Sequence, residues 1–316
     1  MSVTGWRRAL PCLAILAAAP CGSCAREDGE RSAEPPVTER PAPELATRVT
    51  NAYPAYSSDG AWIAYMSNAD GDFDIYVMNL SEGVRRKLTH APGRDGTPAW
   101  APDGTKIAFQ SYRDGPSQVY VMNADGSNPR NLSNGPWNDE HPTWSADGTR
   151  IVFASDRQAS EGEEGNIDLY EMRADGTDVR RITNTPEVET YPSWSPDGTR
   201  IACRKILPDG NWEVVVMDAD GSDPVVIAPH AAADGWPAWS PDGARLAFAS
   251  ERAGSSDLYV IELGTGEIRR VTFDEEADDR QAWWSPDGRY LAFSRYVWFR
   301  DQPFFEASEI LITRAP

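Results

Sequence analysis

Apolar and polar positions divide residues 44–316 into short strands separated by turns. No stretch of this region keeps the 3.6-residue apolar period of an amphipathic helix. The strands expected in one representative unit are Thr97–Trp100, Lys106–Phe109, Gln118–Met122 and Arg130–Leu132. Residues 101–104 (Ala-Pro-Asp-Gly) favour a tight turn between the first two, because Pro presets φ and Gly accepts a positive φ. The pattern predicts a four-stranded antiparallel meander.

This unit recurs six times. Each copy closes its first strand with an aromatic residue, followed by Ser-Pro-Asp-Gly or a close variant; these key aromatics are Tyr56, Trp100, Trp144, Trp194, Trp239 and Trp284. Measured between the turn aspartates, the steps are 44, 44, 50, 45 and 45 residues. A period in this range is typical of propellers, in which blades bury their faces against one another around an axis. We therefore predict an all-β fold, a six-bladed β-propeller of four-stranded antiparallel blades.

The two ends of the repeat region predict how the ring closes. The sixth unit has a third strand at Glu309–Thr313 but no fourth strand after it. The run Leu45–Thr50, before the first unit, matches the fourth strands expected at Lys87–Thr89 and Arg181–Thr183. We expect this N-terminal strand to complete the last blade, which would leave no open sheet edge at the seam.

The N-terminus resembles an export signal, with Arg7-Arg8 followed by an apolar run over 9–19. That run is too short to span a bilayer. Cys24, preceded by Gly-Ser, is expected to be the acylated cysteine of a bacterial lipoprotein, and ordinary secretion with cleavage after Ala25 stays open. The predicted division is a signal peptide at 1–25, a flexible tether at 26–43 and the propeller at 44–316. The expected location is the periplasmic or extracellular face of the envelope.

Charge narrows the class of partner. The chain has 30 Lys and Arg against 49 Asp and Glu, a formal charge of −19. Nucleic-acid binding needs a Lys/Arg face and is not expected. The charge favours a cationic partner, or serves solubility alone. Cys203, the one cysteine of the propeller region, follows Ile-Ala in a strand and is expected to be a buried structural residue.

A candidate binding site follows from the strand pattern. Five residues before the key aromatics stand Asn51, Asp95, Asp139, Glu189, Asp234 and Asp279, which are expected to ring the mouth of the central channel. Three residues before the key aromatics, Tyr191 and Trp236 add aromatic walls. Such a ring suits a cationic peptide or side chain, or a metal ion. The alternative is structural: the acids accept main-chain N–H bonds and orient their loops.

Two long loops are expected on the same face. Residues 157–165 are acidic, and residues 296–305 include Trp298, Phe299 and Phe304 beside Arg300. Aromatic residues next to arginine are typical of interface hot spots. The alternative is that these aromatics fold down, either to plug the top of the sixth blade or to cover the channel.

The repeated pattern P-x-W-S-P-D-G-x-x-I-A-F, then D-I-Y-V-M and R-x-L-T, resembles the TolB-type propeller repeat, a relative of WD repeats, over residues 44–316. The resemblance implies a docking ring for envelope proteins. TolB carries an α/β domain before its propeller where this chain has the tether, so that domain's role does not carry over. The expected protein is therefore an exported, lipid-anchored, monomeric docking platform without enzymatic activity or cofactor.

The alternative from another class is a metal-dependent lyase or hydrolase, or a small-ligand-binding propeller, using the acidic mouth. The histidines His90, His141 and His230 stand 10, 3 and 9 residues before their key aromatics, and these unequal offsets argue against a preformed metal cluster. The chain has no G-x-S-x-G nucleophile motif, so no hydrolase of that type is expected.

Overall fold

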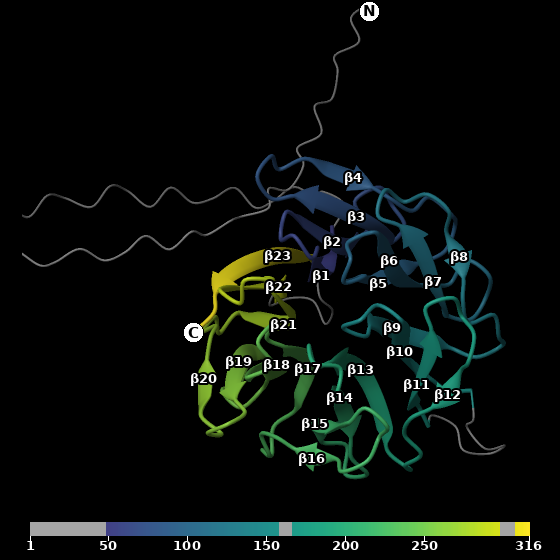
Figure 1. Cartoon of the computed structure of the whole chain (residues 1–316). Coiled ribbons are helices and arrows are strands. Elements are labelled where there is room, and N and C mark those ends of the chain that lie inside the picture. Colours follow the sequence, from purple (N-terminus) through teal and green to yellow (C-terminus); the bar gives the residue numbers. More distant parts are fainter. Residues whose placement is uncertain (1–48, 158–165, 298–306) are drawn as a thin grey trace, which may run out of the picture.

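The computed structural model describes residues 49–157, 166–297 and 307–316. Within these ranges every regular element is a strand, and the strands form six sheets arranged around a central axis (Figure 1). The predicted six-bladed propeller is confirmed. Among the same residues, no helix with the length and apolarity of a membrane span is found.

The blades follow one another in chain order. Blade 1 contains β1 (Asn51–Tyr56), β2 (Trp62–Ser67), β3 (Asp74–Asn79) and β4 (Arg85–Lys87). Blade 2 contains β5 (Asp95–Trp100), β6 (Lys106–Ser111), β7 (Gln118–Asn123) and β8 (Arg130–Asn131). Blade 3 contains β9 (Asp139–Trp144), β10 (Arg150–Ser155), β11 (Asp168–Arg173) and β12 (Arg180–Arg181).

The second half of the ring repeats this order. Blade 4 contains β13 (Val188–Trp194), β14 (Arg200–Ile206), β15 (Trp212–Asp218) and β16 (Val225–Val226). Blade 5 contains β17 (Asp234–Trp239), β18 (Arg245–Ser250), β19 (Asp257–Glu262) and β20 (Ile268–Arg270). Blade 6 contains β21 (Ala277–Trp284), β22 (Tyr290–Val297) and β23 (Ala307–Arg314).

The turn after each first strand is fixed by its own polar side chains. In blade 6 the Ser285 hydroxyl donates to Asp287 Oδ1 (2.6 Å) and accepts from the Tyr290 N–H (2.9 Å). Gly288 takes a φ of 68°, which a glycine adopts without steric cost. The Ser-Pro-Asp-Gly sequence therefore forms a compact hairpin turn.

The key tryptophans connect neighbouring blades. The indole N–H groups of Trp144, Trp239 and Trp284 donate to carbonyl oxygens of the preceding blade at 3.1, 3.2 and 3.0 Å. Their rings lie in apolar clusters that draw side chains from two adjacent sheets. The core of the molecule is thus a series of layers between blades, which explains why one aromatic residue is repeated in every unit.

The first and last blades contact each other directly. Thr50 forms a bridge with Ser308, whose hydroxyl donates to the Asn51 carbonyl (2.8 Å), and the Tyr53 N–H donates to Ser294 Oγ (3.0 Å). An apolar cluster continues across this seam from β2 and β3 to β22 and β23. Within the described residues blade 6 has three strands. Residues 45–48 of the expected closing strand lie outside them, so the strand exchange stays a prediction.

Candidate docking site at the channel mouth

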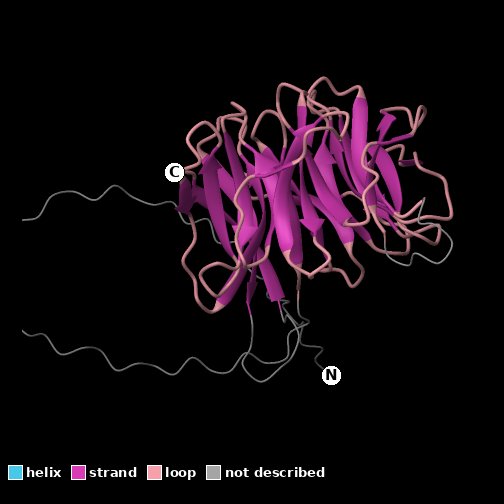
Figure 2. Cartoon of the chain, turned by 90° about the horizontal axis from the view of Figure 1, so that it is seen from below, coloured by secondary structure: helices cyan, strands magenta, loops and turns pink. Residues whose placement is uncertain are grey.

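The propeller has two unlike faces. One, the loop face, carries the loops that lead into each first strand and the loops between second and third strands; the other, the turn face, carries the Asp-Gly turns. Figure 2 shows the strands running between these two faces of the propeller. The residues five and three positions before the key aromatics stand at and near the loop-face end of each innermost strand.

The five acids of the predicted ring are buried ion-pair partners. Their exposed fractions are 0 or 1%. Each pairs with a cation at the end of the second strand of its own blade: Asp95 with Arg113 (2.8 Å), Asp139 with Arg157 (2.8 Å), Glu189 with Lys205 (3.2 Å), Asp234 with Arg252 (2.8 Å) and Asp279 with Arg295 (2.8 Å). The carboxylates therefore lie inside the blades. That they contact a partner directly stays a prediction.

Blade 1 shows what these pairs do. It has Asn51 in place of the acid, and Ala69 stands where Arg113 and Arg157 stand in blades 2 and 3, 18 residues after the ring position. Blades 2 to 6 thus have both the acid and the cation, and blade 1 has neither. This matches a structural charge pair, since either group alone would be a buried, uncompensated charge. In the sequence, each ring acid is followed by its cation 16 or 18 residues later. Counting the acids alone missed this signal.

For three of the ring acids, burial is the main cause of a raised pKa, ahead of repulsion from other acids. Burial raises the pKa of Asp95, Glu189 and Asp234, and the paired cations and hydroxyl hydrogen bonds only partly offset it. Other residues line the chamber at the mouth.

Those residues stand three positions before each key aromatic. All six adopt left-handed backbone with φ between 46° and 57°: Tyr53, Thr97, His141, Tyr191, Trp236 and Gln281. At this point the pairing of every first strand with its second shifts register. Left-handed conformation costs a non-glycine residue about 1–3 kcal/mol and concentrates at functional sites. Here it brings the six residues together as the lining of one chamber of about 90 Å³.

Aromatic rings dominate the mouth. The hydroxyls of Tyr53 and Tyr191 lie 3.2 Å apart, and the Tyr191 ring centroid lies 3.8 Å from that of His141 and 5.6 Å from that of Trp236. The Arg204 guanidinium carbon lies 4.6 Å from the Tyr191 centroid and 5.2 Å from that of Trp236. The structure thus places the predicted residues Tyr191 and Trp236 together at the mouth. Trp298, Phe299 and Phe304 lie outside the described residues, as does most of the acidic loop.

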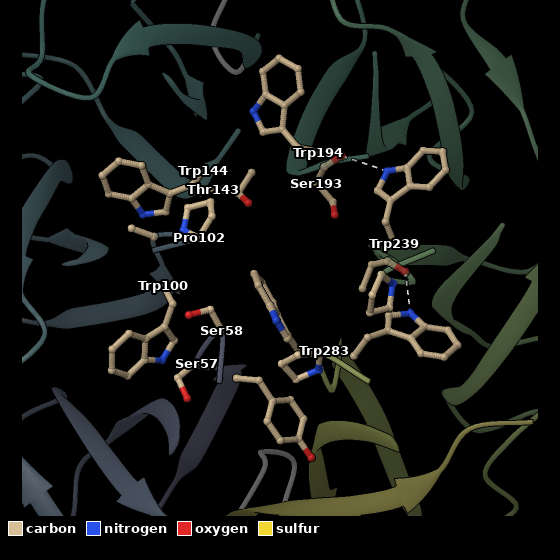
Figure 3. Close-up of a pocket in the computed structure, with 16 residues that line it drawn as sticks. Ser57, Ser58, Trp100, Pro102, Thr143, Trp144, Ser193, Trp194, Trp239 and Trp283 are labelled. Carbon is tan, nitrogen blue, oxygen red and sulfur yellow. Dashed lines mark hydrogen bonds between the residues drawn. The ribbon is translucent and has the colours of Figure 1, made fainter. Parts of the chain in front are cut away.

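A tryptophan divides the channel. One position before the key aromatic, five blades carry small residues: Ala55, Ala99, Thr143, Ser193 and Ala238. Blade 6 carries Trp283, whose indole stands in the middle of the channel (Figure 3). It borders both the mouth chamber and a second chamber of about 230 Å³ on the turn face, which the key tryptophans surround. The pair Trp283-Trp284 was the sequence signal for this partition.

The family model of the TolB beta-propeller domain matches residues 47–205 and 192–298. The chain belongs to the TolB beta-propeller family. Among solved structures it is similar to TolB of Acinetobacter baumannii, with 22% identity and a TM-score of 0.64 over 75% of this chain and 57% of that one. A TolB-type protein of Agrobacterium tumefaciens has 20% identity and a TM-score of 0.64 over 84% of this chain and 90% of that one.

Enzymes share this fold. An oligogalacturonate lyase in complex with manganese is similar with 18% identity and a TM-score of 0.59, over 82% of this chain and 74% of that chain. At these identities the likeness shows the fold alone. In the TolB-type propeller described here, His90 and His230 are exposed on the loop face and His141 lines the mouth. Burial, with the charges of Arg204 and Arg94, lowers the pKa of His141 to about 3, so this imidazole is neutral at physiological pH. In the described part of the chain, no three His, Cys, Asp or Glu residues are grouped to hold a metal ion.

Proposed function

We propose that this TolB-type propeller is an exported, lipid-anchored docking platform of the cell envelope, without enzymatic activity, and that it contacts its protein partner through the loop face around the channel mouth. The observation that carries the proposal is the gathering of aromatic side chains at the mouth and on the face around it.

Two exposed aromatics with arginines against their rings lie on the loop face. Phe273, before β21, is 67% exposed, and the Arg270 guanidinium lies 5.0 Å from its ring centroid. Trp137, before β9, is 38% exposed, and Arg157 lies 5.3 Å from its ring. Arginine and large aromatics are the residues most enriched among interface hot spots. The five ring acids are paired with cations of their own blades, so the aromatic residues, rather than the carboxylates, contact the envelope protein.

The channel favours docking over turnover. Trp283 divides it into two chambers, and His141 at the mouth is held neutral with its Nδ1 buried. A metal-dependent lyase or a small-ligand propeller is the competing function, and its support is the likeness of fold. Stoichiometric manganese, calcium or zinc in protein purified without chelator would favour it.

The envelope location and the lipid anchor have separate support. Membership of the TolB family fits export, and Cys24 after Gly-Ser fits lipoprotein processing. Labelling cells with a radioactive fatty acid tests the anchor: label on the wild-type chain and its loss in Cys24→Ala support it. Equal labelling of the wild type and Cys24→Ala, or no labelling of either, would contradict the lipid anchor at Cys24.

Docking is tested by placing a photo-crosslinking amino acid at single positions of the full chain expressed in its native cell. Phe273 and Trp137 sample the loop face, and Tyr290, 42% exposed at the start of β22, is a matched exposed aromatic on the turn face. The proposal predicts one covalent adduct of defined mass from both loop-face positions and none from Tyr290. Equal adducts from both faces, or none from any position, would contradict it.

A further inference from the structure

Blade 4 departs from the repeat at Arg204. In the other five blades the equivalent position of the second strand, three residues after the first buried apolar residue, is uncharged: Met66, Gln110, Ala154, Ala249 and Ser294. Arg204 therefore adds a cation beside the mouth aromatics Tyr191 and Trp236 that the propeller frame does not require. Its side chain needs room from the neighbouring blade, because a Cβ on Gly235 would lie 2.9 Å from Arg204 Cδ.

Arg204 is surrounded by aromatic rings. Its guanidinium carbon lies 4.6 Å from the centroid of Tyr191, 4.5 Å from that of Trp212 and 5.2 Å from that of Trp236. Its Nε donates to Thr190 Oγ1 at 3.1 Å. These contacts fix the plane of the guanidinium and limit its hydration, as in sites where arginine recognises carboxylates.

No carboxylate of the described residues lies within ion-pair distance of Arg204, in contrast to the five ring cations. Burial lowers the pKa of Arg204, with Arg280 acting in the same direction. Arg94, directly before β5, likewise has no ion pair in the described part of the chain, and both arginine charges act on His141. The mouth is thus locally cationic in an acidic chain. With a Debye length of about 8 Å at physiological ionic strength, these near charges outweigh the distant net charge.

We infer that Arg204 is the receptor for a carboxylate on the docked partner, presented by an acidic side chain or a C-terminus of an extended peptide segment whose flanking groups pack on Tyr191 and Trp236. A guanidinium binds a carboxylate through two parallel N–H···O bonds, which a lysine or an amide cannot reproduce. Tyr191 and Trp236, which Arg204 contacts, also line the chamber of about 90 Å³, and a chamber of this size suits a single small group rather than a folded surface. This inference rests on the proposed docking function and reverses the partner charge that counting acids suggests.

The test uses short capped peptides and the full chain. The probes are acetyl-Gly-Glu-Gly amide, its Gln counterpart as a neutral match, and its Lys counterpart as a cation. Binding is followed by the indole N–H resonance of Trp236, whose Nε1 is buried without a hydrogen-bond partner in the described structure. We expect the Glu peptide to bind at least about tenfold more tightly than the Gln peptide, equivalent to about 1.4 kcal/mol, and the Lys peptide not to bind.

Two arginine variants separate recognition from folding. Arg204→Gln is expected to abolish the preference for Glu over Gln. Arg200→Gln, which changes an arginine of the same blade stacked 4.7 Å from Trp239 on the turn face, is expected to keep it. Equal binding of the Glu and Gln peptides to the wild type, or an unchanged preference in a folded Arg204→Gln, would overturn the inference.

Crosslinking and peptide binding distinguish the docking function from the role of Arg204. Adducts from Phe273 and Trp137 without carboxylate preference would leave docking standing and remove the role of Arg204. Carboxylate preference without any adduct would remove the docking platform. Adducts that map to a partner segment lacking Asp, Glu and a C-terminus would also contradict the inference.

Discussion

The buried pair of Asp234 and Arg252 gives the sharpest prediction about stability. Asp234 is fully buried, and Arg252 is 16% exposed, with its Nη2 2.8 Å from Asp234 Oδ2 and its Nε donating to Ser250 Oγ at 2.8 Å. For unit charges about 4 Å apart at an effective dielectric constant of about 20, the Coulomb attraction is about 4 kcal/mol. Desolvation costs several kcal/mol per ion. The pKa of Asp234 is raised, with burial as the largest cause, so the attraction only partly offsets that cost.

Removing one partner should therefore cost more than removing both. Asp234→Asn or Arg252→Ala is expected to lower the free energy of unfolding by about 3–5 kcal/mol, because a buried charge is left uncompensated. The double variant reproduces the Asn51 and Ala69 of blade 1. We expect it to be at least about 1 kcal/mol more stable than Arg252→Ala, although it removes more atoms.

Urea unfolding followed by tryptophan fluorescence measures all four proteins of this double-mutant cycle. In Arg252→Ala the pKa of Asp234 should rise further, so the folded state binds the proton more tightly than the unfolded state does. The stability deficit should then be full at pH 7 and shrink as the pH falls towards the unfolded-state pKa of about 3.9. Additive single effects, or a deficit that grows on acidification, would refute the reasoning.

Three further predictions concern the channel and the core. Trp283→Ala should join the two chambers, which a crystal structure would show. It should also lower the free energy of unfolding, measured in urea, by about 3 kcal/mol; this is at the low end for tryptophan because the side chain is only partly buried. His141 has a pKa of about 3, below its unfolded value of about 6.5, so its contribution to stability is lost as the pH falls from 6.5 towards 3. Between pH 7 and pH 5 the wild type should lose up to about 2 kcal/mol more than His141→Gln, and equal losses would contradict this. Cys203 is buried with a raised pKa, so iodoacetamide should label it only after unfolding, as mapped by peptide mass; labelling of the native chain would contradict its burial.

Much of the fold could be predicted because each unit repeats the same physical requirements. An apolar run, a Pro-Asp-Gly turn and an inter-blade tryptophan recur with a fixed period, and all are local in sequence. The expected strand Lys106–Phe109 lies within β6, and Gln118–Met122 lies within β7. The closing strand at residues 45–48 lies outside the described structure, so that part of the prediction stays open.

The site was only partly predictable, because its character depends on contacts between residues distant in sequence. Counting back from the key aromatic located Asp139 at the loop-face end of a strand, but not the burial that Arg157 compensates 18 residues later. Left-handed backbone at Tyr191 depends on the register shift in its blade, which no single-residue preference signals. The aromatic surroundings of Arg204 combine Tyr191 and Trp212 of blade 4 with Trp236 of blade 5, and only the folded ring brings them together.

The central claim is that the buried ion pairs stabilise the blades, whereas the aromatic residues at the mouth contact the partner. One comparison tests it. The crosslinker at Phe273 is placed in three backgrounds: wild type, the Asp234→Asn, Arg252→Ala double variant, and Trp236→Ala, each first shown to be folded. We predict that the partner adduct persists in the double variant and falls at least about tenfold in Trp236→Ala. Loss of the adduct in the folded double variant, with retention in Trp236→Ala, would show that the ring acids are the docking surface and that the aromatic mouth is not.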